Sequence, residues 1–78
     1  MSPKLPVVSG AELIRVLQKI GYEVIRQRGS HVRLYPPPDT LCKPTTVPLH
    51  NELSKGTLKG ILPQAGLSAD EFLCLLER

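Results

Sequence analysis

The chain has 78 residues, a formal net charge of +3 and 41% hydrophobic residues. A chain of this length forms one small domain with little room for a deep substrate cleft, which a long polymeric substrate does not need. No apolar run is long enough to cross a bilayer, and the first residues lack the apolar segment of a signal peptide, so we expect a cytoplasmic protein without a membrane partner.

The positive charge is concentrated in the middle of the chain. From Arg26 to Lys59 there are six basic and two acidic residues, whereas the rest of the chain has four basic and five acidic ones. A local excess of this kind is expected of a nucleic-acid footprint. An ordinary solvated surface explains the charge about as well, so the charge alone does not separate the two.

The two cysteines, Cys42 and Cys74, form no CxxC pair and lie far apart in the sequence. A disulfide between them has no support, and we expect both to be reduced thiols. No pair of cysteines or histidines has a usual metal-ligand spacing, so neither a metal site nor a cofactor is expected.

A first helix is predicted from the capping box of Ser9 and Glu12, which precedes apolar residues at helical spacing. Gly21 ends it. Two strands follow, at residues 22–28 and 31–35, because both segments are rich in aromatic, β-branched and long side chains. Gly29 and Ser30 between them suit a two-residue type II′ turn.

Counting back from this turn fixes the register of the hairpin. It pairs Arg28 with His31, Arg26 with Arg33 and Val24 with Tyr35 on one face, and Gln27 with Val32 and Ile25 with Leu34 on the other. The first face is then cationic and the second apolar. Like charges directly opposite each other are unfavourable in a sheet, so Arg26 across from Arg33 indicates a bound anion.

The second half of the chain completes the predicted fold. A proline-rich loop runs from Pro36 to about Lys43, and residues 45–48 form a short third strand. A helix begins at about Lys55, with Pro63 near its end and Gly66 as its C′ residue. A second capping box, of Ser68 and Glu71, opens a last helix.

The resulting order is αβββαα, without an internal repeat or a linker, so residues 1–78 are expected to form a single domain. Two main helices on one face of a three-stranded antiparallel sheet leave the other face open, which is an α+β arrangement. It is also the order of the double-stranded RNA-binding domain, with an additional C-terminal helix. A fold alone does not give a function, so residues on the open face must carry that argument.

Several short motifs, weak singly, occur along the chain in a specific order. They are Ser9-Gly10 before the first helix, Leu17 with Gly21-Tyr22, Arg28-Gly29-Ser30-His31, Val47-Pro48 with His50, and Lys55-Gly56-Thr57-Leu58 with Ile61-Leu62. In this order and at these spacings, the chain resembles the HicA-type mRNA interferase toxins of bacterial toxin–antitoxin modules over nearly its whole length. The resemblance implies a double-stranded-RNA-binding-like fold, metal-independent cleavage of mRNA, a catalytic histidine at His31 and neutralisation by a HicB-type antitoxin.

Two features depart from the commoner pattern of that family. Val32 stands where many members have a second histidine or an aromatic residue, and the loop from Pro36 to Pro44 is long. Neither removes the proposed catalytic group, and both leave the RNA preference open.

His31 and His50 are weighed separately. An imidazole changes its protonation near neutral pH, so it can accept the proton of the RNA 2′-hydroxyl or protonate the departing 5′-oxygen. A surface histidine beside a hairpin is the commoner role, and the family resemblance is what favours catalysis by His31. His50 is either the complementary acid or base or a structural residue of a turn-rich stretch, and the structural role is preferred.

The basic residues on and around the cationic face are candidate RNA contacts. Arg26 and Arg33 are positioned to clamp a phosphate and offset the charge of the pentacoordinate intermediate. The other candidates are Arg28, Gly29 and Ser30 near the turn, and Lys55 and Lys59 at a helix N-terminus, where free amides favour anions. Two rivals remain: a noncatalytic RNA-binding module that uses the same face, and a protein that acts mainly by binding another protein.

Overall fold

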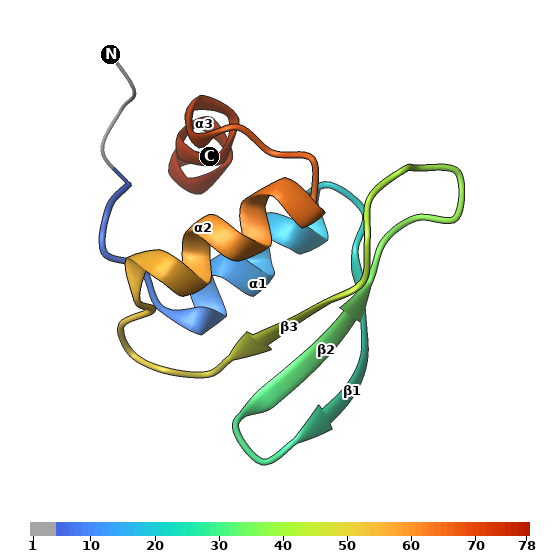
Figure 1. Cartoon of the computed structure of the whole chain (residues 1–78), viewed down its shortest axis with the longest axis horizontal. Coiled ribbons are helices and arrows are strands. Elements are labelled where there is room, and N and C mark those ends of the chain that lie inside the picture. Colours follow the sequence, from blue (N-terminus) through green and yellow to red (C-terminus); the bar gives the residue numbers. More distant parts are fainter. Residues whose placement is uncertain (1–4) are drawn as a thin grey trace.

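The computed structural model describes residues 5–78, which form one antiparallel sheet and a layer of helices (Figure 1). The elements in chain order are α1 (Gly10–Lys19), β1 (Glu23–Arg28), β2 (His31–Tyr35), β3 (Thr45–Pro48), α2 (Lys55–Gln64) and α3 (Ala69–Glu77). The sheet order is β1-β2-β3, and the helices cover one face of it. The predicted α+β order, with its open sheet and extra C-terminal helix, is confirmed. Within the described residues, no helix has the length and apolar character that a membrane crossing requires.

The ends of α1 are formed by local hydrogen bonds that the sequence encodes. The Ser9 hydroxyl accepts a hydrogen bond from the Glu12 N–H at 3.1 Å, and the Glu12 carboxylate accepts one from the Ser9 N–H at 3.0 Å. At the other end, Gly21 has a φ of 99° and the Tyr22 N–H donates to the Leu17 carbonyl. This is a Schellman ending, which needs a residue in the left-handed region and therefore favours glycine. Both predicted ends of the helix are confirmed.

The end of α2 and the start of α3 also agree with the predicted signals. Helix α2 extends one residue beyond Pro63, and Gly66, with a φ of 68°, follows its C-cap. Helix α3 opens with the capping box of Ser68 and Glu71. Hydrogen bonds from the Ser68 backbone N–H, and then its side chain, hold the pKa of the Glu71 carboxyl below its ordinary value.

The hairpin turn and the pairs nearest to it agree with the predicted register. Gly29 has a φ of 55° and Ser30 does not have a positive φ, which is the pattern of a type II′ turn. The predicted pairs Arg28–His31, Arg26–Arg33 and Gln27–Val32 are all present.

The predicted register is wrong beyond Arg26, because a bulge interrupts β1. Val24 pairs with Leu34 and Glu23 pairs with Tyr35, so Ile25 is the extra residue. The predicted pairs Val24–Tyr35 and Ile25–Leu34 therefore do not form. Every residue of β1 is exposed, including Ile25 at 55%, so no core contact holds this edge strand to strict alternation. Bulges are common at such edges, and counting at a period of two cannot detect one.

Tyr22 lies just before β1 rather than in it, and it attaches the proline-rich loop to the domain. The side chain is buried, and its hydroxyl donates a hydrogen bond to the Lys43 carbonyl at 2.7 Å. Burial, with a smaller contribution from Cys42, raises the pKa of the Tyr22 phenol. Cys42 and Cys74 are both free thiols, as expected.

The core lies between the sheet and the helices, and α3 contributes the fully buried Phe72 to it. Leu13 and Leu17 of α1, Leu34 of β2 and Phe72 of α3 have no exposed surface. Lys19 also joins α1 to α3, because its Nζ donates to the backbone carbonyls of Leu75 and Arg78 at 2.7 and 2.6 Å. The last helix is therefore an integral part of the hydrophobic core.

Gly10 brings the start of α1 against the end of β3. Its N–H donates to the His50 carbonyl at 2.9 Å, and a Cβ at this position would overlap the Pro48 carbonyl oxygen. Because that obstacle is backbone, it cannot rotate away. The Ser9-Gly10 pair therefore combines a helix cap with a close contact that fixes the end of β3.

Candidate functional site

The open face of the sheet brings the predicted catalytic residue and the arginines together. His31 of β2 lies between Arg28 of β1 and Pro48 of β3, and Arg33 lies between Arg26 and Thr46. Residues directly opposite each other across an antiparallel pair point to the same face. The face turned away from the helices therefore carries three guanidinium groups and one imidazole.

These side chains surround a shallow hollow, which we call the arginine hollow. It has a volume of about 160 Å³ and is lined by Arg26, Arg28, His31, Arg33 and Thr46. No carboxylate is among the lining residues, so the positive charges are not neutralised from within it. Guanidinium groups that converge without an acidic partner form a binding site for a phosphate or carboxylate. The exposed imidazole of His31 is placed to exchange a proton with a group bound there.

Arg33 is the arginine whose position the protein controls most closely. Its Nη1 donates to the Thr46 Oγ1 at 3.0 Å, and its Cζ lies 5.6 Å from the centre of the Tyr35 ring. A hydrogen bond on one side and a cation–π contact on the other restrict the guanidinium before any ligand binds.

Thr46 was missed as a site residue by the sequence analysis. It reaches the arginine hollow only because β3 pairs with β2 in a register that sets it across from Arg33. A four-residue strand after a long loop carries too little pattern to fix that register. Thr45 and Val47 are buried and Thr46 between them is exposed. The one sequence signal for this is Val47, because an apolar residue that faces the core sets its neighbour Thr46 on the open face.

The remaining predicted residues do not line the arginine hollow. Gly29 and Ser30 form the turn next to His31, and the Ser30 carbonyl accepts a hydrogen bond from the Leu49 N–H at 2.6 Å. Lys55 and Lys59 are exposed on α2. The predicted set of free amides at the start of α2 is reduced, because the Ser54 hydroxyl accepts the Thr57 N–H at 3.1 Å.

His50 lies outside the arginine hollow. It follows β3, its side chain is exposed, and its backbone carbonyl accepts the hydrogen bond from Gly10. It is absent from the residues that line the arginine hollow. The hydrogen bond from Gly10 is to the backbone of His50, so the role of the His50 side chain stays a prediction.

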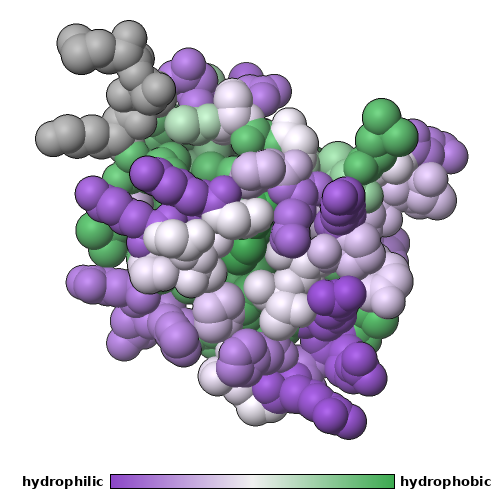
Figure 2. All heavy atoms as spheres, viewed as in Figure 1, coloured by the Kyte–Doolittle hydropathy of each residue, from purple (hydrophilic) through white to green (hydrophobic). Residues whose placement is uncertain are grey.

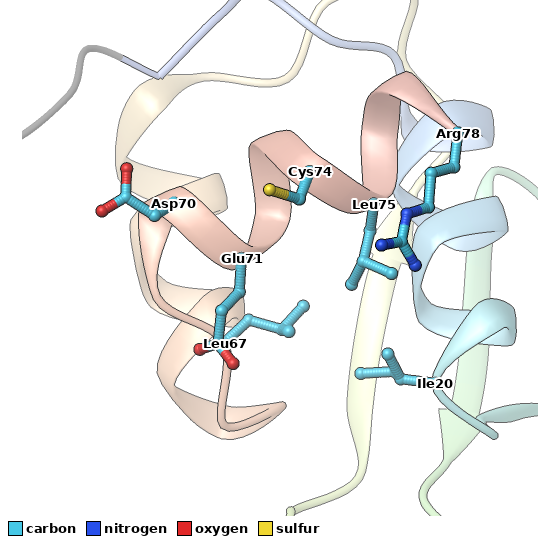
Figure 3. A pocket seen from close by; sticks show the side chains of 7 residues that line it. All are labelled: Ile20, Leu67, Asp70, Glu71, Cys74, Leu75 and Arg78. Atoms are coloured by element: carbon cyan, nitrogen blue, oxygen red, sulfur yellow. The ribbon is translucent and has the colours of Figure 1, made fainter.

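A larger hollow, of about 460 Å³, lies on the helical side of the molecule (Figure 3). It is lined by Ile20, Leu67, Asp70, Glu71, Cys74, Leu75 and Arg78. Its apolar side chains are those of Ile20 just after α1, of Leu67 between α2 and α3, and of Leu75 on α3, with charged groups around them. None of the predicted site residues belongs to it. Among residues 5–78, no three His, Cys, Asp or Glu side chains are grouped so that they could hold a metal ion.

One comparison with known families gives a match over most of the chain. A family model described as the HicA toxin of bacterial toxin-antitoxin matches residues 10–67. The match includes α1, the whole sheet and α2, and it ends before α3. No curated protein matches the chain.

Proposed function

The chain belongs to the HicA toxin family of bacterial toxin–antitoxin modules, and we propose that it is an endoribonuclease that cleaves mRNA without a metal ion. The observation that carries this proposal is the exposed imidazole of His31 beside three guanidinium groups in the arginine hollow. The phosphate of an RNA chain supplies the anion that this arrangement lacks. RNA also supplies its own nucleophile, the 2′-hydroxyl. The protein therefore supplies a proton-transfer group and the positive charges that hold the phosphate.

The proposed reaction is an internal transesterification. The 2′-oxygen forms a bond to the adjacent phosphorus while its proton goes to a base, and the bond from phosphorus to the 5′-oxygen breaks as that oxygen gains a proton. The products end in a 2′,3′-cyclic phosphate and a 5′-hydroxyl. His31 acts as the general base or the general acid in this exchange.

The arginines have a separate role from His31 in this proposal. Arg26 and Arg33 hold the phosphate and offset the extra negative charge of the pentacoordinate intermediate. Arg28, the turn of Gly29 and Ser30, and Lys55 and Lys59 on α2 contact neighbouring parts of the RNA backbone. Such contacts position a substrate and do not select its sequence.

We expect a Thr46→Val variant to reveal how far catalysis depends on the fixed position of Arg33. Valine keeps the shape of the side chain but removes the hydroxyl that accepts the Arg33 hydrogen bond. One such bond is worth about 0.5–3 kcal/mol, so kcat/KM for RNA should fall by about twofold to 150-fold with the fold intact. Steady-state cleavage rates, with circular dichroism as the check on folding, test this. A fall of the same size in a Thr40→Val variant, which changes the distant loop, would contradict the assignment.

The proposed partner is a HicB-type antitoxin, and the proposed location is the cytoplasm, where mRNA is available. An antitoxin that neutralises the enzyme covers the open sheet face and presents acidic groups to the arginine hollow. On this proposal residues 1–78 act as one domain, and no cofactor takes part.

A noncatalytic RNA-binding module is the second candidate, and one observation favours it. The arginine hollow contains a single group able to transfer protons near neutral pH, because His50 does not line it. Water or a second group must then complete the proton exchange. An RNA-binding module would need the arginines but not His31.

The experiment that tests the proposal is product analysis with the wild-type protein in EDTA. We expect cleavage of a long purified RNA to persist, with 2′,3′-cyclic phosphate ends, and a 2′-deoxy nucleotide at a mapped cleavage site to block cleavage there. Products with 5′-phosphate ends, or a need for added metal ions, would contradict the mechanism. RNA that is bound but never cut would favour the binding module.

A further inference from the structure

A groove runs between strand β3 and helix α2, next to the arginine hollow. It has a volume of about 390 Å³ and is lined by Arg33, Pro44, Thr45, Thr46, Gly56, Thr57, Gly60, Ile61 and Gln64. Arg33 and Thr46 line both the groove and the arginine hollow, so the two spaces share a wall. Figure 1 shows α2 alongside β3, and Figure 2 shows hydrophilic side chains gathered at the lower end of the molecule, where the hairpin lies.

The backbone of Thr46 faces the outer edge of the sheet. In an antiparallel pair, alternate residues bond to the neighbouring strand. The Leu49 N–H donates to the Ser30 carbonyl, so the bonded positions of β3 are Val47 and Thr45, and the N–H and C=O of Thr46 point away from β2. At the next outward position, Pro48 has no N–H and its carbonyl lies against Gly10. The open part of this edge is therefore at Thr46, where the groove lies.

The opposite wall of the groove has two helix positions without side chains. Gly56 and Gly60 are one turn apart on α2, and a Cβ added to either would meet no atom within 4 Å. Glycine inside a helix is less stable than alanine, and here no neighbouring atom excludes a larger residue. The packing of the protein itself does not explain the two glycines, whereas close approach of a ligand to the helix does.

The chemistry of the lining suits a nucleoside better than a second phosphate. It offers the Thr46 and Thr57 hydroxyls and the Gln64 amide, and Arg33 is its one charged residue. Thr45, which is 2% exposed and the one buried polar residue in the described chain, also lines it. Hydroxyls, an amide and an unpaired strand edge donate and accept hydrogen bonds without carrying charge, as the edges of a base and a ribose require.

We propose that this groove binds the nucleotide next to the cleaved phosphate and that the edge of β3 at Thr46 contacts its base. The inference rests on the proposed function for its substrate. RNA is preferred over an acidic antitoxin segment because the groove continues from the phosphate site and contains a single cation, whereas an acidic segment would need several. On this proposal the open sheet face contacts phosphates, and the groove beside it contacts a base.

A Gly60→Leu variant fills the groove and leaves the arginine hollow unchanged. We expect its Kd for a short 2′-O-methylated RNA, which cannot be cleaved, to rise about tenfold, the loss that one or two hydrogen bonds account for. A Gly60→Ala variant should raise the melting temperature, because alanine favours the helix. Ala11→Leu, which adds three carbons at an exposed position of α1 where Gly60→Leu adds four, should bind the RNA as the wild type does and is the matched control.

Binding of an uncleavable RNA separates this inference from the proposed function. If the wild type cleaves RNA and Gly60→Leu binds the oligonucleotide with an unchanged Kd, the groove proposal is overturned and the ribonuclease proposal stands. If neither the wild type nor the variant cleaves RNA but Gly60→Leu still binds the oligonucleotide tenfold more weakly, the ribonuclease proposal is overturned and RNA binding in the groove stands. A Gly60→Leu variant that binds RNA normally and fails only to bind an antitoxin would assign the groove to a protein partner and overturn the inference.

Discussion

A His31→Ala variant is expected to cleave RNA about 10²–10⁴-fold more slowly than the wild type, which is the usual contribution of a general acid or base. It should bind RNA with nearly unchanged affinity, because the guanidinium groups of the arginine hollow remain. His31 is exposed and opposite Arg28 and Pro48, so its removal leaves no cavity in the core. Single-turnover cleavage and fluorescence anisotropy with the same labelled RNA measure the two quantities.

Loss of binding together with cleavage would change the interpretation of His31. It would then be a contact for the RNA rather than a proton-transfer group. The affinity measurement therefore decides what a loss of cleavage means.

A Phe72→Ala variant is expected to lower the free energy of unfolding by about 3–5 kcal/mol. Phe72 is the largest fully buried side chain in the described chain and has no exposed surface. Small domains have about 5–15 kcal/mol of stability in total, so this loss would leave the protein close to unfolding. Urea denaturation followed by circular dichroism measures it.

The control for Phe72→Ala is Cys74→Ala on the same helix. Cys74 is exposed, so its replacement should change the free energy of unfolding by no more than about 0.5 kcal/mol. A Phe72→Ala variant as stable as Cys74→Ala would mean that α3 is a dispensable appendage. That result would contradict the core described here.

Helix α3 shows a difference between what defines the family and what holds this chain together. The family match ends at residue 67, and α3 begins at Ala69. Phe72 nevertheless fills the core, and Lys19 of α1 donates to two carbonyls of α3. Part of the core is thus contributed by residues outside the segment that the family model matches.

The helix ends could be predicted from the sequence because their causes are local. A capping box needs only a serine and a glutamate three residues apart, and a Schellman ending needs only a glycine at the right place. Ser9, Gly21, Gly66 and Ser68 act in the structure as the sequence indicates. Such signals depend little on the rest of the fold.

The sheet was predictable only near its turn. Gly29 fixes the pairing of Arg28 with His31 and of Arg26 with Arg33, and this pairing forms the arginine hollow. The bulge at Ile25 lies farther from the turn, on an edge strand with no buried residue to oppose it. Thr46 was missed for a related reason, because its place opposite Arg33 depends on a long-range pairing that local pattern does not encode.

The most direct test of the account compares the two histidines on one RNA in EDTA. Initial cleavage rates are measured for the wild type, His31→Ala and His50→Ala, with RNA binding followed in parallel. We predict that His31→Ala loses cleavage and keeps binding, while His50→Ala, whose side chain lies outside the arginine hollow, cleaves at close to the wild-type rate. Cleavage by His31→Ala at the wild-type rate would contradict the central claim that His31 performs the chemistry in the arginine hollow.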